Sequence, residues 1–95
     1  MEVLVAYDVA TETAEGRRRL RRVAKVCLAH GQRVQKSVFE CRLNEVQYEQ
    51  MIHNLLNEIS EKEDSLRIYR LIEPRQRFLR AYGRAVVDLS GPLIV

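Results

Sequence analysis

The sequence has few of the residues that mark specialised protein classes. It contains no Trp, two Pro, four Gly and two Cys among 95 residues. Cys27 and Cys41 are too few for a disulfide framework, and they lack the spaced partners of a zinc site. No apolar run approaches the roughly 18 residues that span a bilayer, and no signal-peptide pattern or glycine-rich ligand loop is visible. We therefore expect a cytoplasmic protein with reduced thiols and no membrane partner.

The length and composition indicate one small globular domain. Hydrophobic residues make up 46% of the chain and charged residues 31%. A core of this size leaves much apolar surface exposed, so docking against a second copy would add considerable stability. The sequence therefore favours a homodimer.

The charge is distributed unevenly along the chain. Residues 1–43 carry nine basic and five acidic groups, residues 44–64 one and six, and residues 65–95 six and two. Thirteen of the sixteen cations are Arg, whose planar fork binds phosphate oxygens in pairs. This distribution suits a polyanionic partner, although a source organism that favours Arg would give the same composition.

The first half of the chain predicts a strand followed by a helix. Residues 2–8 are almost continuously apolar, which is typical of a central strand buried on both faces. Apolar residues at helical spacing follow between residues 20 and 28. We expect Thr13 or a neighbour to cap this helix, and Gly31 to end it in the left-handed conformation.

The middle of the chain predicts extended structure and then a second helix. Residues 33–43 form either one strand or two strands with a reversal near residues 35–37, and the local sequence leaves both open. Asn44 and Gln47 match a capping box. The apolar face of the helix that they open comprises Tyr48, Met51, Ile52, Leu55, Leu56 and Ile59.

The last third predicts further strands. Residues 66–72 alternate as a strand does, Pro74 ends it, and residues 78–82 are a candidate short strand. The apolar residues 93–95 are expected to pair onto a sheet edge. Two helices alternating with strands predict a sandwich with the helices on one side. The open face of the sheet would keep apolar side chains, which a second copy would cover.

Asp8 stands where the first strand ends and the chain turns toward the helix. Backbone rigidity fixes a carboxylate at such a place while the following loop leaves it accessible to a metal or substrate. An Asp there also commonly starts a turn or caps a helix. Both interpretations stay open on the residues alone.

Four blocks of sequence together resemble the CRISPR-associated protein 2 family. They are Val5-Ala6-Tyr7-Asp8-Val9, the run at 16–21 (GRRRLR), the run at 31–41 (GQRVQKSVFEC) and the run at 64–71 (DSLRIYRL). Each block alone is common, but the four share the order and spacing of the family. The resemblance extends from residue 1 to about residue 83.

The resemblance implies an α+β fold, a ferredoxin-like βαββαβ sandwich over residues 1–83 with a reversal within 35–38. It implies a tail at 84–95 that adds an extra C-terminal edge strand, and a homodimer with facing sheets. Such a dimer would serve spacer acquisition in CRISPR antiviral defense: it would bind duplex DNA and bridge the CRISPR-associated integrase, CRISPR-associated protein 1. The resemblance also implies a Mg²⁺-dependent endonuclease that cleaves RNA or duplex DNA, with the metal held near the dimer axis by Asp8.

The residue patterns and the family resemblance together suggest roles for individual residues. Asp8 is the candidate metal ligand, and Asp8 and Tyr7 are the candidate catalytic residues, with Tyr7 either orienting Asp8 or packing in the core. Phe39 belongs to the dimer interface or the core. The arginines expected to contact nucleic acid are Arg17, Arg19, Arg33, Arg75 and Arg77. His30 and His53 are expected to have no metal role.

Three functions compete at this stage. A scaffold would bind DNA and the integrase without needing Asp8. A nuclease would need Mg²⁺ shared by one carboxylate from each of two protomers, since Asp8 alone cannot hold the ion. A stand-alone toxin ribonuclease of the VapD-like kind would share the fold. We expect the scaffold first and the nuclease second.

Overall fold

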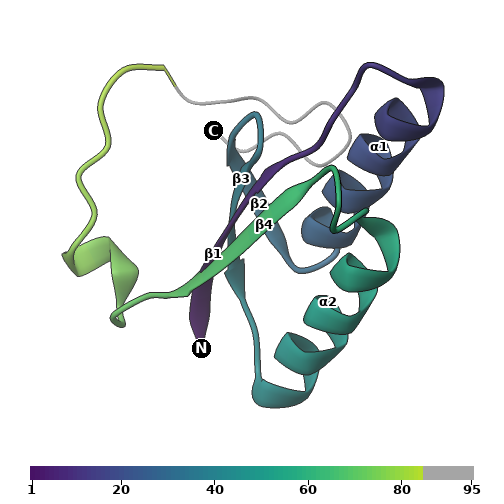
Figure 1. The fold of residues 1–95 in the computed structure, drawn as a ribbon. Coiled ribbons are helices and arrows are strands. Elements are labelled where there is room, and N and C mark those ends of the chain that lie inside the picture. Colours follow the sequence, from purple (N-terminus) through teal and green to yellow (C-terminus); the bar gives the residue numbers. More distant parts are fainter. Residues whose placement is uncertain (85–95) are drawn as a thin grey trace.

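The structure, a computed structural model, describes residues 1–84. Its elements are β1 (Glu2–Asp8), α1 (Ala14–Leu28), β2 (Gly31–Gln35), β3 (Val38–Arg42), α2 (Glu45–Glu58), β4 (Ser65–Arg70) and the short 3-10 helix η1 (Arg75–Arg77). The sheet has the strand order β2-β3-β1-β4 with every neighbour antiparallel. Both helices cover one face of it (Figure 1). The expected α+β, ferredoxin-like βαββαβ fold is confirmed, including the reversal between β2 and β3.

β1 is the central strand because it pairs with β3 on one side and with β4 on the other. Its odd-numbered residues Val3, Val5 and Tyr7 are buried, since alternate residues of a strand point to opposite faces and the helices cover this one. Together with Phe39 and Cys41 of β3 they form the sheet side of the hydrophobic core. The even-numbered residues of β1 face the open side of the sheet.

α1 begins as the sequence predicts but ends differently. The Thr13 side chain accepts a hydrogen bond from the backbone N–H of Gly16 at 3.0 Å. Ala29 caps the helix in a right-handed conformation, and Gly31 is the first residue of β2. Among the described residues only Gly83 has a positive φ. The prediction that Gly31 ends the helix in the left-handed conformation was wrong. Glycine is needed at this position because the backbone of β3 lies very close to it: a Cβ on residue 31 would lie 2.1 Å from the Glu40 carbonyl oxygen.

α2 begins with the predicted capping box. The Asn44 side chain accepts from the Gln47 backbone N–H at 2.8 Å, and the Gln47 side chain accepts from the Asn44 backbone N–H at 2.9 Å. Met51 and Leu55 are fully buried against the sheet, whereas Leu56 is 49% exposed. The assignment of Leu56 to the apolar face was wrong, because it lies one residue, about 100° of helix rotation, beyond Leu55.

The chain after β4 forms a segment without strands, residues 71–84, which contains η1 and which we call the arm. β4 ends at residue 70, two residues earlier than predicted. Residues 78–82 are not a strand, since within the described part of the chain no strand pairs with them; that prediction was wrong. The expected extra strand at 84–95 and the pairing of residues 93–95 concern positions that, from residue 85 on, lie outside the described residues.

The arm is attached to the open face of the sheet by ion pairs. The Arg75 guanidinium contacts Glu2 of β1 through Nη1 and Glu40 of β3 through Nε, the latter at 3.2 Å. The Arg75 backbone N–H also donates to Glu2 at 3.0 Å. Beyond this anchor the arm runs along the outer edge of the molecule (Figure 1). Within residues 1–84 no helix has both the length and the apolar character needed to cross a membrane.

Candidate functional site

Asp8 is the last residue of β1 and lies at the tip of the sheet. It is exposed, and it pairs in register with Ser65, the first residue of β4. Because Tyr7 points toward the helices, the alternation of the strand directs Asp8 to the open face. A short loop, residues 9–13, then leads into α1. The structure thus places the predicted carboxylate at an accessible sheet end.

Tyr7 and Phe39 both lie in the core of the protomer. Tyr7 is 6% exposed and Phe39 is fully buried. Their rings stack with centroids 6.1 Å apart. Tyr7 therefore points away from Asp8, and Phe39 presents no surface of this protomer to a partner chain. Of the alternatives that the sequence left open, the structure places both residues in the core.

The donor set for a magnesium ion is incomplete in one protomer. Within residues 1–84 no group of three His, Cys, Asp or Glu side chains lies close enough to hold a metal ion. Asp8 supplies a single carboxylate with oxygen ligands of the type that Mg²⁺ prefers. A second carboxylate at this tip would have to come from another protomer.

Arg19 and Arg75 have carboxylate partners inside the protomer. Arg19 Nε lies 2.9 Å from Asp64, and Arg19 Nη2 lies 3.3 Å from Glu63. The hydrogen bond to Asp64 raises the pKa of Arg19 despite the opposing effect of burial. Arg75 contacts Glu2 and Glu40, as described above. Their guanidinium groups are therefore engaged rather than directed to the solvent as phosphate ligands would be.

Arg33 of β2 packs on the helix-covered side of the sheet. Its guanidinium carbon lies 5.1 Å from the centroid of the Phe39 ring, a cation–π geometry. Its Nε is buried and has no hydrogen-bond partner among the described residues. Arg33 and Phe39 are partners in the antiparallel register of β2 and β3, so the Arg33 side chain packs against the buried Phe39 ring.

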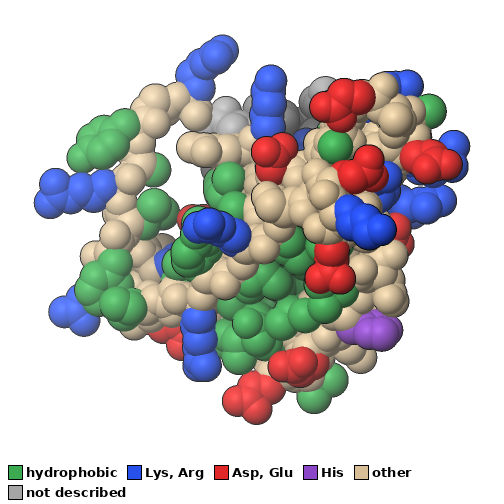
Figure 2. All heavy atoms as spheres, in the orientation of Figure 1, with side chains coloured by type: hydrophobic (Ala, Val, Ile, Leu, Met, Phe, Trp, Pro, Cys, Tyr) green, Lys and Arg blue, Asp and Glu red, His purple; other side chains and the backbone are tan. Residues whose placement is uncertain are grey.

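Arg17 and Arg77, by contrast, are exposed. Arg17 lies in the first turn of α1 and donates to the Thr11 carbonyl oxygen at 3.1 Å. Arg77 lies on the arm. Lys and Arg side chains stand out along the arm and around the start of α1 (Figure 2). These two zones are open to a polyanion, as are the exposed Arg42, Arg67 and Arg70 of the sheet.

Two residues near Asp8 have no role that the sequence predicts. Arg67 of β4 lies beside Ala6 on the open face, and its guanidinium donates to the Tyr69 hydroxyl at 3.1 Å. Asp64 is buried between α2 and β4. The alternation of β4 predicts the face of Arg67, but nothing local to Asp64 indicates a partner 45 residues earlier.

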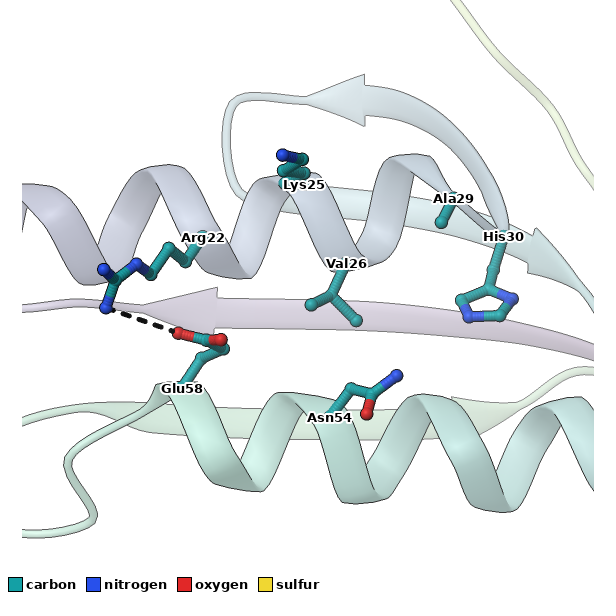
Figure 3. Close-up of a pocket in the computed structure, with 7 residues that line it drawn as sticks. All are labelled: Arg22, Lys25, Val26, Ala29, His30, Asn54 and Glu58. Carbon is teal, nitrogen blue, oxygen red and sulfur yellow. Dashed lines mark ion pairs between the residues drawn. The ribbon is translucent and has the colours of Figure 1, made fainter.

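A groove of about 410 Å³ lies on the other side of the molecule, between α1 and α2. Figure 3 shows its lining, in which Arg22 pairs with Glu58 at 4.0 Å at one end and His30 lies at the other. Val26 and Asn54 lie between them. The groove is separated from Asp8 by the sheet, so it takes no part in the site at the tip.

Comparison with known proteins identifies the family. Residues 1–78 match the model of the family described as CRISPR associated protein Cas2. The chain belongs to the Cas2 family. The matched region takes in Asp8 and all five predicted arginines and ends at Phe78 in the arm.

Two relatives of this Cas2 family member match it over nearly their whole length. A Moorella thermoacetica protein named CRISPR-associated endoribonuclease Cas2 1 is 55% identical, with all of both chains covered. A Halalkalibacterium halodurans protein named CRISPR-associated endonuclease Cas2 is 45% identical, with 99% of both chains covered. The crystal structure of Streptococcus pyogenes Cas2 at pH 6.5 superposes with a TM-score of 0.80 at 51% identity, and covers 87% of this chain and 100% of its own.

Proposed function

We propose that this protein acts in CRISPR spacer acquisition as a homodimer that binds duplex DNA and bridges the CRISPR-associated integrase, CRISPR-associated protein 1. Membership of the Cas2 family supports the CRISPR context. The observation that supports DNA binding is that the arginines fall into two groups. Some form ion pairs with carboxylates inside the protomer, and others are exposed at its surface.

Seven exposed arginines form two cationic zones, while the exposed Arg42, Arg67 and Arg70 lie on the sheet. One is on α1 and the other is on the arm, and the members are Arg17, Arg18, Arg21 and Arg22, then Arg77, Arg80 and Arg84. Within residues 1–84 only Arg22 of this set has an ion-pair partner, Glu58 at 4.0 Å. Guanidinium groups without carboxylate partners are available for phosphate oxygens. Because contacts of guanidinium groups with phosphates carry no sequence information, the expected binding is independent of sequence and sensitive to salt.

The homodimer is supported by apolar surface that one protomer leaves uncovered. The open face of the sheet carries Leu4, Ala6 and Val38, each only partly buried. The arm exposes large hydrophobic side chains, namely Ile72, Phe78, Leu79 and Tyr82. Exposed apolar patches of this kind mark interaction surfaces. A second copy facing this sheet would cover them and would bring a second Asp8 into the same particle.

Salt-dependent DNA binding tests the proposal. The measurement is fluorescence anisotropy of a labelled 30-base-pair duplex at several salt concentrations, at a protein concentration that keeps the oligomeric state fixed. Arg17→Ala and Arg77→Ala should each weaken binding and lower the slope of log K against log salt by about one per lost phosphate contact.

Lys62→Ala is the matched control for this measurement. It also removes one positive charge from an exposed residue, but Lys62 lies in the acidic segment 44–64. We expect its slope to equal that of the wild type. A binding constant nearly independent of salt, or an equal loss in Lys62→Ala, would refute binding through the two cationic zones.

Metal-dependent phosphodiester cleavage is the second candidate. It is supported by the exposed Asp8 and by the names of the relatives, which are called an endoribonuclease or an endonuclease. Mg²⁺ would supply an activated water and would offset charge on the leaving oxygen. Asp8 would hold the ion together with Asp8 of a second protomer, because one carboxylate does not suffice.

The two candidates differ in their need for Asp8. If cleavage is the activity, Asp8→Asn should abolish Mg²⁺-dependent hydrolysis of RNA or duplex DNA while the dimer persists. If the protein is a scaffold, Asp8→Asn should leave DNA binding, integrase binding and spacer capture intact. Cleavage that persists in an identically purified Asp8→Asn protein would identify a contaminating nuclease and refute the second candidate.

A further inference from the structure

Asp64 joins three separate parts of the chain through one buried carboxylate. Its side chain has no exposed surface. It accepts hydrogen bonds from the backbone N–H of Ala10 at 3.0 Å and of Ser60 at 2.8 Å, and from Arg19 Nε at 2.9 Å and Nη2 at 3.3 Å. Four donors satisfy a buried carboxylate well, since each oxygen accepts two of them. The carboxylate therefore ties the loop after β1 to α1 and to the connection before β4.

These contacts lie on both sides of Asp8. Ala10, whose N–H is held by Asp64, follows Asp8 by two residues. Ser65, which directly follows Asp64, is the register partner of Asp8 in the β1 and β4 pair. Fixing Asp64 thus fixes the chain as it leaves β1 and also the strand beside it.

The other groups of the loop are held by α1. A Cβ at Gly16 would lie 1.9 Å from the Ala10 carbonyl oxygen, so the helix approaches this peptide closely. The Thr11 carbonyl oxygen accepts from Arg17. These contacts join the loop to α1 at its N-terminal end, and the ion pair of Arg19 with Asp64 adds a link deeper in the protein, since Asp64 also holds the Ala10 N–H.

Burial raises the pKa of Asp64, but hydrogen bonds from Arg19, Ser60 and Ala10 lower it by more, so its pKa lies below the ordinary value. The carboxylate is charged at neutral pH, and Arg19 is the cation that neutralises it. The Nε and Nη2 donors of Arg19 are taken up by Asp64 and Glu63, so most of its hydrogen-bonding capacity is used inside the protomer.

We propose that Arg19 and Asp64 are positioning residues that hold Asp8 at the tip of the sheet, and that Arg19 acts through Asp64 rather than by contacting nucleic acid. The importance of Asp8 itself rests on the proposed function. The local structural claim does not, because it concerns the protein without nucleic acid.

Amide hydrogen exchange followed by NMR tests the positioning role on the full chain. Arg19→Ala and Asp64→Asn should each speed exchange of the Ala10 amide at least tenfold, and should shift the Asp8 amide resonance. Exchange at Val5, in the middle of β1, should change less than threefold, which separates a local effect from global destabilisation. The double variant should exchange no faster at Ala10 than the faster single variant, because both substitutions break the same link.

Arg21→Ala is the matched control, since Arg21 is an exposed arginine of the same helix; its Ala10 exchange should equal that of the wild type. If Asp64→Asn fails to fold, Arg19→Ala decides the question alone. Unchanged Ala10 exchange in Arg19→Ala, or acceleration equal at Ala10 and Val5, would overturn the proposal.

The salt dependence of DNA binding separates the two roles of Arg19. Arg19→Ala should keep the wild-type slope, whereas Arg17→Ala should lower it by about one. A slope lowered equally in both variants would show that Arg19 contacts phosphate and would overturn the claim that it acts through Asp64. Failure of all variants and the wild type to bind DNA would defeat the proposed function, while the exchange results would still decide the positioning role.

Discussion

Removing the Arg75 side chain should destabilise the protein far more than removing its neighbour Arg77. Arg75→Ala breaks the ion pairs to Glu2 and Glu40 and leaves two carboxylates on the sheet without their cation. Glu2 is only 4% exposed. Removing one partner of a buried ion pair costs about 3 to 5 kcal/mol. Because Arg75 keeps some contact with solvent, we expect a loss near the lower limit, about 3 kcal/mol.

Urea unfolding monitored by circular dichroism measures this loss. With a slope of about 1.5 kcal/mol per molar urea, a loss of about 3 kcal/mol lowers the midpoint by about 2 M. Arg77→Ala is the control, because Arg77 lies in the same turn with an exposed side chain, and it should change stability by less than about 0.5 kcal/mol. Protein concentration must be equal in all samples, since association adds to apparent stability.

Two further results would test the ion pairs of Arg75. Arg75→Lys should lose part of the stability, because one ammonium group replaces a fork that contacts two carboxylates. Equal urea midpoints for Arg75→Ala and Arg77→Ala would refute the conclusion that the ion pairs of Arg75 stabilise the fold.

Three more predictions follow from buried groups. Gly31→Ala should destabilise the protein by about 3 kcal/mol in the same urea assay, because the new methyl group would overlap the β3 backbone; an unchanged midpoint would contradict this. Burial raises the pKa of Cys27 to about 12 and of Cys41 to about 11, so iodoacetamide at pH 8 should modify the native Cys41 about 100-fold and the native Cys27 about 1000-fold more slowly than the unfolded thiols; equal rates would contradict it. The lowered pKa of Asp64 adds stability that is complete at neutral pH and is lost as pH falls below its ordinary value of 3.8 toward the folded one. The urea midpoint should therefore fall less steeply below pH 4 in Asp64→Asn than in the wild type, and parallel curves would refute this.

The sequence predicts those parts of the fold that depend on neighbouring residues. Thr13, Asn44 and Gln47 cap helices through contacts three residues away, and the apolar run of β1 requires a central strand wherever its partners come from. The resemblance to a family added what the local sequence left open, the reversal between β2 and β3.

The errors and omissions concern contacts between distant residues. Gly31 matches a helix-ending pattern, but its glycine is required by β3, ten residues away in register. Arg19 and Arg75 look like surface cations in the sequence, and only the fold shows that their carboxylate partners lie 45 and 73 residues away. Residues 78–82 have a strand-like composition, but a strand forms only where another backbone is available to pair with it.

Tyr7 and Asp8 are neighbours in the chain, yet one belongs to the interior and the other to the solvent. Their side chains lie on opposite faces of the sheet because alternate residues of β1 point to opposite faces. A deletion of one residue between Val3 and Tyr7 would therefore turn Tyr7 toward the open face and Asp8 toward the helices. The carboxylate would then be driven against the Phe39 ring and the phenol turned outward. Evolution and protein engineering can therefore substitute residues along this strand. They cannot change its length without disrupting both the packing of the core and the exposed position of Asp8 at the tip of the sheet.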